Sequence, residues 1–355
     1  MADNPGDTVP IVAGLTRAEV LEIFEALVRA RAAEERLELL FKQGHVGGGV
    51  YRSLGQEAGS VGSAYALRRR TDGTGDIIAQ TIRETGAVFL MGGRPVDYFR
   101  QYLARATSPT RGREANVHWC DWDRGLVGPV SPLGTMVEIM AGITLSFRLR
   151  GEDRVGLVYY GDGASSTGAW HEGLNFAAVQ RCPMVLMVEA NRWAFSTPTS
   201  KQTRVQSFIE KGPGYGIPAV AVDGTDVLAV FEATRTAVEA ARAGEGVHLI
   251  EMQYYRRKGH AQHDPQDYVD PEEIRAWEAK DPITSFKTRM LESAWATPDE
   301  VEGIRTRVED EIRQAADAAI SEDLPEGPDA LPDVYTDSGA RDLWTRGAAA
   351  DPRTA

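Results

Sequence analysis

The sequence predicts an α/β protein with a mainly parallel sheet and helices on both faces. Near-continuous apolar runs bounded by glycine, such as residues 155–160, are typical of strands that are buried on both faces of a parallel sheet. These runs alternate with segments whose apolar residues recur at helical spacing, and this alternation indicates strand–helix–strand units. The length of 355 residues is enough to bury a core without disulfides or a structural metal.

The composition excludes several classes of function. The 39 basic and 52 acidic residues give a net charge of −13, which argues against binding to duplex nucleic acid or to an anionic membrane. Cys120 and Cys182 cannot form a disulfide framework, and we expect Cys182 to be a small buried residue. No run approaches the ~20 apolar residues of a membrane helix, and residues 1–15 lack the pattern of a secretory signal. We therefore expect a soluble, cytoplasmic protein.

The first half of the chain contains two expected helices before an irregular region. After a flexible tail over residues 1–15, the pattern Thr-x-x-Glu at Thr16 predicts the start of a helix that runs to about Phe41. Residues 108–135 are rich in Gly, Pro and Ser, and an irregular stretch of that length inside a compact domain is usually functional. The other expected elements here are a helix after Gly55–Ala58, a strand over 76–80 and a helix over 135–149.

The second half continues the alternation of strands and helices. The expected strands cover 155–160, 184–189, 219–222 and 247–252, and the expected helices cover about 166–181 and 227–243, with a long loop over 191–216. We assign residues 16–324 to one domain. The proline- and charge-rich residues 325–355 are expected to form an extended tail that crosses the surface or docks on a partner.

Two polar side chains follow neighbouring strands of this predicted sheet. Asp162 and Asn191 come directly after two strands and are separated by one strand–helix–strand unit. Ligands bind at the carboxyl ends of the strands in open parallel sheets, and carboxylate and amide oxygens suit Mg²⁺ or Ca²⁺. Gly161 and Gly163 permit a tight turn, and the N–H groups of the following helix would face a diphosphate. Gly-Asp-Gly alone is a weak signal, but Asn191 at this spacing makes it specific.

The turn Gly161–Gly163 together with Asn191 resembles the thiamine-diphosphate motif, which begins Gly-Asp-Gly and ends in a pair of asparagines. Over about residues 16–320, further blocks in the family's order resemble the alpha subunit of two-component 2-oxoacid dehydrogenases. The resemblance implies the diphosphate-binding half of a thiamine-diphosphate-binding fold, in the decarboxylating component of pyruvate, branched-chain 2-oxoacid or acetoin dehydrogenase complexes. The blocks are Gly55–Ala58, Ser131–Gly134, His171–Ala177, Ser196–Ser200, Gly212–Gly216 and Val222–Asp226.

The resemblance also implies roles for single residues. Mg²⁺ would be held by the side chains of Asp162 and Asn191 and by the main-chain carbonyl of Trp193. Arg83 matches the arginine that pairs with the diphosphate, and His260 matches the catalytic histidine on a mobile loop. The remaining cofactor contacts would come from Ser131 and Leu133, which touch the aminopyrimidine and support the bent cofactor, and from Gly161, Gly163 and Ala164 at the diphosphate.

Three positions depart from the family's pattern. Ala190 replaces the first asparagine of the pair, but the metal ligand is the second, so the metal site should survive. Ile82 replaces a tyrosine, which removes one hydroxyl contact to the cofactor. Ala261 stands where mitochondrial relatives carry a phosphorylated serine, so phosphorylation at this position is chemically excluded.

The other histidines have less specific interpretations. His171 lacks the second histidine of a zinc-protease helix and fits a helix surface or a structural hydrogen bond better. His260, His263 and Asp264 are close in sequence, but acid–base or anion-binding work is favoured over a zinc site there. For His118 we leave open a place at the substrate entrance or a structural role, and His45 is the weakest candidate.

The resemblance implies an active site that is shared with a second chain. In the family, the glutamate that protonates the aminopyrimidine belongs to a beta subunit, and no block here resembles that half. We therefore expect a heterotetramer of two alpha and two beta subunits, which passes the acyl group to a lipoyl carrier on an acyltransferase component.

The choice of substrate stays open at the level of sequence. The blocks Ser196–Ser200 and Gly212–Gly216 favour a branched-chain 2-oxoacid of the 2-oxoisovalerate type, whereas His171–Asn175 is shared with pyruvate and acetoin enzymes. A non-catalytic homologue is a distant alternative. A potassium ion near Ser131–Thr135 is a further open question.

Residues 255–270 contain almost no aliphatic side chains, so little burial is expected to order them without a ligand. The consecutive cations at 256–258 would favour order only when an anion such as the diphosphate is present, and Asp264 and Asp267 could pair with them. We predict that this segment is mobile without cofactor and becomes ordered with it.

Overall fold

The computed structural model describes residues 10–331 and confirms the predicted α/β architecture. Six strands form one sheet in the order β4-β3-β5-β6-β10-β9, and every neighbouring pair in it is parallel. From β3 the chain passes to the edge strand β4 and then crosses back to β5 on the other side of β3. The strand connections therefore change direction between β3 and β5. The strands are β3 (Ile77–Ala79), β4 (Leu126–Val127), β5 (Gly156–Gly161), β6 (Met184–Ala190), β9 (Ala219–Asp223) and β10 (His248–Gln253).

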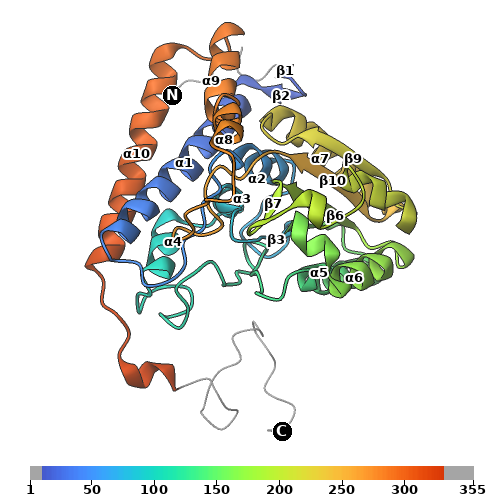
Figure 1. Cartoon of the computed structure of the whole chain (residues 1–355), viewed down its shortest axis with the longest axis horizontal. Coiled ribbons are helices and arrows are strands. Elements are labelled where there is room, and N and C mark those ends of the chain that lie inside the picture. The colour runs from blue at the N-terminus through green and yellow to red at the C-terminus, as the bar shows by residue number, and fades with distance from the viewer. Residues whose placement is uncertain (1–9, 332–355) are drawn as a thin grey trace.

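Both faces of the sheet are covered, as the apolar strand runs predict. Leu157 and Tyr159 of β5 belong to one hydrophobic cluster, whereas Val158 and Tyr160 belong to the other. Every residue of β6 is buried. In Figure 1, α5 and α6 lie together beside one face of the sheet, and α1, α2 and α7 contribute to the cluster on the other face. These helices span α1 (Arg17–Lys42), α2 (Glu57–Tyr65), α5 (Thr135–Arg150), α6 (Gly168–Val179) and α7 (Val227–Ala240).

The first long helix begins where the sequence predicts. A short hairpin of β1 (Pro10–Val12) and β2 (Leu15–Thr16) leads into α1. The hydroxyl of Thr16 accepts a hydrogen bond from the Glu19 N–H at 3.3 Å, and the Glu19 carboxylate accepts one from the Thr16 N–H at 2.8 Å. This capping box pairs two N–H groups that would otherwise lack a partner, and it fixes the start of α1.

The sequence analysis did not assign five helices: α3 (Thr85–Leu90), α4 (Pro95–Tyr102), α8 (Pro271–Glu278), α9 (Pro282–Glu292) and α10 (Pro298–Ser321). Of these, α3, α9 and α10 pack against α1. Figure 1 shows α10 running alongside α1, and α10 also packs on α4. The ion pairs Arg17–Glu300 at 2.5 Å and Arg29–Glu311 at 3.0 Å join the first and last long helices of the described chain.

Several element boundaries differ from the prediction. The helix expected at about 166–181 is preceded by a separate 3₁₀ helix η2 (Asp162–Ser166), because Thr167 caps α6 by accepting the Trp170 N–H at 3.3 Å. The helix expected to end at 243 gives way to a π turn η5 (Ala241–Glu245). The loop over 191–216 contains the hairpin β7 (Trp193–Ala194) and β8 (Thr197–Pro198) and the 3₁₀ helices η3 (Thr199–Lys201) and η4 (Phe208–Tyr215).

The remaining predicted elements are confirmed within a few residues. In the stretch 108–135 that was expected to be irregular, residues 108–125 contain neither helix nor strand, but Leu126–Val127 form the strand β4. After α10, irregular chain around a short 3₁₀ helix η6 (Gly327–Ala330) leads to residue 331, and residues 332–355 and 1–9 lie outside the described residues. The division into a domain and two tails remains a prediction. Within residues 10–331, no helix combines the length and the apolar character that a membrane span requires.

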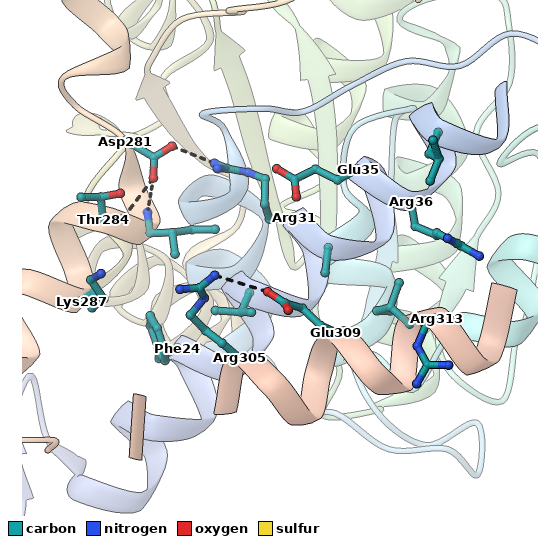
Figure 2. Close-up of a pocket in the computed structure, with 15 residues that line it drawn as sticks. Phe24, Arg31, Glu35, Arg36, Asp281, Thr284, Lys287, Arg305, Glu309 and Arg313 are labelled. Atoms are coloured by element: carbon teal, nitrogen blue, oxygen red, sulfur yellow. Dashed lines mark hydrogen bonds and ion pairs between the residues drawn. The ribbon is translucent and has the colours of Figure 1, made fainter. Parts of the chain in front are cut away.

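A cavity of about 520 Å³ lies between α1, α9 and α10 (Figure 2). Two pairs of its charged lining residues form ion pairs, Arg31 with Asp281 at 2.9 Å and Arg305 with Glu309 at 3.4 Å. Asp162 does not line this cavity.

Candidate functional site

The residues that carry the predicted chemistry meet at the carboxyl ends of β3, β5 and β6. Asp162 follows β5 and Asn191 follows β6, and the last residue of β5 is in register with Glu189 of β6. Arg83 lies shortly after β3, which is the other neighbour of β5. The site therefore forms at the point where the strand connections change direction, as in other open parallel sheets.

The carboxylate of Asp162 is buried and held by neutral donors. Oδ2 accepts hydrogen bonds from the Thr199 hydroxyl at 2.8 Å and the Gln202 amide at 3.4 Å, and Oδ1 accepts one from the Gly163 N–H at 2.8 Å. Burial raises the pKa of Asp162, and these hydrogen bonds together with the nearby charge of Arg256 offset part of that effect. Within residues 10–331 Asp162 makes no ion pair, so a bound cation would give its carboxylate a direct contact with positive charge that the described residues lack.

The amide of Asn191 is oriented by Gln56, a member of the block Gly55–Ala58 to which the sequence analysis gave no role at the site. Its Nδ2 donates to Oε1 of Gln56 at 3.1 Å, and its Oδ1 accepts only a long hydrogen bond, 3.4 Å, from the Trp193 N–H. Gln56 is buried directly before α2. Since Gln56 accepts from the NH₂ group, the carbonyl oxygen of Asn191 is left available as a hard oxygen ligand.

The carbonyl of Trp193 accepts a hydrogen bond from Nη1 of Arg256 at 3.1 Å. Arg256 is fully buried and also donates to the carbonyl of Phe195 at 2.8 Å and the hydroxyl of Tyr268 at 2.5 Å. The predicted third metal ligand therefore already contacts a cation, although a carbonyl oxygen has a second lone pair.

Two buried arginines at the site lack an acidic partner. Arg83 is 8% exposed and donates to the carbonyls of Arg52 at 3.2 Å and His260 at 2.8 Å. Burial and the charge of Arg83 lower the pKa of Arg256. Neither Arg83 nor Arg256 makes an ion pair within the described residues. Two unpaired buried cations beside an unpaired buried acid fit an anion with its own metal cation, such as a magnesium diphosphate.

The turn after β5 permits close approach of the backbone. A Cβ on Gly163 would lie 2.6 Å from the Cβ of Ala194, so a side chain at this position would displace β7. Gly161 and Ala164 line a cavity of about 300 Å³ at the site. The helix that follows Asp162 is the short 3₁₀ helix η2 rather than α6, so the expected α-helical N-terminus is not at this turn.

The imidazole of His260 lies within the electrostatic influence of Arg83 and Arg256. Its ring is edge-on to that of Tyr51, with centroids 5.5 Å apart, and close to that of Phe195 at 4.8 Å. Burial and the charges of Arg83 and Arg256 lower the pKa of His260 to about 4. The histidine is therefore neutral near pH 7, the form that can accept a proton.

The start of segment 255–270 is more buried than the sequence predicts. Tyr255 is 1% exposed, and Arg257 is 7% exposed and pairs with Asp281 at 2.9 Å. The expectation that Arg257 needs a ligand anion is therefore wrong. The carboxylate of Asp264 accepts a hydrogen bond from the His260 N–H at 2.6 Å. Its link to Arg256 is indirect, because Tyr268 donates to Asp264 and accepts from Arg256 through the same hydroxyl. Asp267 makes no ion pair in the described chain. That the rest of this segment becomes ordered when the cofactor binds remains a prediction.

The 300 Å³ cavity brings together residues from distant parts of the sequence. Ser131, Leu133 and His260 all line it, and Leu133 is 65% exposed. Gln80, which directly follows β3, also lines it and was missed by sequence reasoning. The only local signal was a polar residue at the end of an apolar run.

The other histidines take different positions. His118 lines the 300 Å³ cavity, with its Nδ1 3.4 Å from the carboxylate of Glu114. His171 is exposed on α6 and hydrogen-bonds the hydroxyl of Tyr215. His263 and His45 are exposed, and Cys182 is buried as predicted.

Comparison with known proteins identifies relatives along most of the chain. The family described as "Dehydrogenase E1 component" matches residues 25–327. The chain is 32% identical to pyruvate dehydrogenase E1 component subunit alpha of Rhizobium meliloti, over 92% of this chain and 91% of the relative. It is 33% identical to 2-oxoisovalerate dehydrogenase subunit alpha of Bacillus subtilis, over 86% of this chain and 94% of the relative. It is 32% identical to the alpha subunit of an acetoin oxidoreductase of B. subtilis, over 90% of this chain and 95% of the relative.

Proposed function

Because the chain belongs to the dehydrogenase E1 family, as an alpha subunit, we propose that it binds magnesium and thiamine diphosphate at the Asp162 site and serves the oxidative decarboxylation of a 2-oxoacid. The charge arrangement supports this proposal: a buried acid without a cation lies near two buried arginines without an acid. A magnesium diphosphate would place a cation against the buried acid and an anion against the two arginines.

Three oxygens are proposed to hold the metal: a side-chain oxygen of Asp162, the amide oxygen of Asn191 and the carbonyl of Trp193. The hydrogen bond from Asn191 to Gln56 supports this assignment, because it leaves the amide oxygen available. For Trp193 to bind the metal, its carbonyl must do so with the lone pair that Arg256 does not use.

The diphosphate is proposed to lie against the turn of Gly161, Gly163 and Ala164, with Arg83 as its cationic partner. Arg256 adds a second buried positive charge. Ser131 and Leu133, which also line the cavity, would contact the aminopyrimidine end.

When bound, thiamine diphosphate supplies the electron sink that loss of carbon dioxide requires. This chain binds and orients the cofactor, and His260 provides a neutral imidazole beside the cavity. We propose that His260 exchanges a proton with the substrate or with the lipoyl group during acyl transfer.

The site is proposed to be completed by a beta subunit, in a heterotetramer of two alpha and two beta chains. Leu133 lines the cavity and is 65% exposed in this chain, which is expected for a residue that a partner covers. The acyl group would then pass to a lipoyl-bearing acyltransferase component.

The substrate is proposed to be of the 2-oxoisovalerate type, with pyruvate or acetoin as alternatives. The support is the pair of sequence blocks at 196–200 and 212–216. Relatives named for each of the three substrates are 32–33% identical, so overall similarity does not separate them. The cytoplasmic location likewise stays a prediction.

Co-expression with the beta partner tests the function. We expect the pair, supplied with thiamine diphosphate and Mg²⁺, to oxidise a 2-oxoacid with an artificial electron acceptor, and the alpha chain alone to show negligible turnover. Robust turnover by the purified single chain would contradict the shared site. Absence of turnover by a pair that binds cofactor would favour the non-catalytic homologue.

A further inference from the structure

The cavity beside His260 has an uncharged lining. None of the side chains that line its volume of about 300 Å³ is an aspartate, glutamate, lysine or arginine. Its polar side chains include Tyr51, Gln80 and Asn116, and its apolar ones include Ile82 and Val130. Such a lining suits a neutral ligand group with hydrogen-bonding capacity.

Gln80 is the most informative of these polar side chains. It is 1% exposed, and neither its Nε2 nor its Oε1 has a hydrogen-bond partner within residues 10–331. Gln80 is the one side chain in that range that leaves two buried polar atoms unpaired. Buried polar groups in folded proteins nearly always have a partner, so this amide is expected to find one in a bound ligand.

Two neighbours in the lining have spare hydrogen-bonding capacity as well. Asn116 accepts the Val117 N–H at 2.7 Å through Oδ1, while its NH₂ group donates to no residue of the described chain. The Tyr51 hydroxyl also has no hydrogen-bond partner in that range, although its ring contacts His260. The polar side of the cavity therefore offers both donors and acceptors.

We propose that this cavity recognises a hydroxyl group on the acyl part of the substrate through the amide of Gln80. A hydroxyl donates and accepts through one atom, so it can pair with both atoms of the amide, whereas a carboxylate only accepts and an ammonium only donates. The inference rests on the proposed function and changes its substrate: a hydroxylated 2-oxoacid takes the place of the 2-oxoisovalerate type that the sequence blocks favour. A purely aliphatic acyl group, as in 2-oxoisovalerate, would leave both amide atoms unpaired.

A matched pair of substrates tests the proposal on the alpha chain assembled with its beta partner. The pair is 2-oxoisovalerate and the same acid with a hydroxyl on its tertiary carbon. The variant Gln80→Leu keeps the approximate size and removes both polar atoms. The control Thr234→Val removes an unpaired buried hydroxyl of α7, which does not line the cavity.

We expect kcat/KM of the wild-type complex to favour a hydroxylated substrate by about 10- to 100-fold, the usual effect of one buried hydrogen-bonding group. Gln80→Leu should abolish this preference, leave the dissociation constant of thiamine diphosphate unchanged in calorimetry and not lower the melting midpoint. Thr234→Val should keep the preference.

Four results would overturn the proposal. A wild-type preference for 2-oxoisovalerate would show that the cavity is an aliphatic one. Equal losses with both acids in Gln80→Leu would assign the amide a structural role, and weaker cofactor binding would make it a cofactor ligand. If the wild-type complex turns over no 2-oxoacid and no acetoin, the proposed function fails, and this substrate assignment fails with it.

Discussion

Replacing Asp162 by asparagine should separate cofactor binding from stability. The carboxylate is 2% exposed and has no ion pair in the described chain, and its burial raises its pKa. Asparagine has nearly the same shape and no charge, so it removes the free-energy cost of burying an unpaired anion. We expect the cofactor-free complex with the beta subunit to gain about 0.5–2 kcal/mol of stability, as is common when a functional site is neutralised.

The cofactor should stabilise only the wild type. At a concentration 100 times the dissociation constant, a ligand stabilises the folded state by about 2.7 kcal/mol. A chain of 355 residues has an unfolding entropy of about 0.7 kcal/mol/K, so this corresponds to a rise of about 4 °C in melting midpoint. The same conversion turns the gain of the cofactor-free variant into about 1–3 °C.

Scanning fluorimetry with and without thiamine diphosphate and Mg²⁺ measures both effects. The control Asp317→Asn removes a carboxylate that is 53% exposed on α10, and it should keep the full cofactor shift. An Asp162→Asn complex that melts earlier than the wild type without cofactor would refute the argument about the buried charge. A full cofactor shift in this variant would refute the metal site.

Two further substitutions test the histidine and its supporting segment. His260→Ala should slow acyl transfer to the lipoyl group by about 10²–10⁴-fold, with little change in the cofactor dissociation constant; a loss in affinity of the same size would make it a binding residue instead. Asp281→Asn keeps the N-cap of α9 but loses the ion pairs with Arg31 and Arg257, so it should lower the free energy of unfolding by about 1–3 kcal/mol at pH 7. Burial alone would raise the pKa of Asp281, but Arg31 and Arg257 hold it at about 2 against the usual 3.8. This stabilisation is therefore complete above about pH 4 and is lost towards pH 2. Chemical unfolding at pH 7 and at pH 3 should show that the difference in unfolding free energy between the wild type and Asp281→Asn shrinks by about 1 kcal/mol after screening is allowed for. A difference that does not change with pH would contradict the assignment.

Features fixed by local chemistry were predictable from the sequence. The start of α1 follows from a hydrogen-bond exchange between Thr16 and Glu19, which are three residues apart. The meeting of Asp162 and Asn191 follows from the geometry of parallel strands, because consecutive crossovers bring strand ends to one edge of the sheet.

Features that depend on distant partners were not predictable. The ion pair of Arg257 with Asp281 joins a segment expected to be mobile to the N-cap of α9, and nothing near Arg257 in sequence indicates this partner. The unpaired state of Gln80 is likewise a property of its surroundings in space, since a glutamine at a strand end usually finds a partner or solvent. The helix α10 carries a local start signal at Thr297, but its position against α1 depends on the packing of both helices.

The pairing of α1 with α10 has a consequence for synthesis of the protein in the cell. The arginine and glutamate of the Arg17–Glu300 ion pair are 283 residues apart, so α1 leaves the ribosome long before the helix that covers it exists. At about 5–20 residues per second this interval lasts roughly 15–60 s. Throughout it, the side of α1 that α10 will cover has no native partner, although the last strand of the sheet, which ends at Gln253, is translated before α10 begins at Pro298. Nascent chains are therefore expected to depend on holding chaperones until α10 has been made, and truncation before Thr297 should yield aggregates rather than a smaller folded subunit.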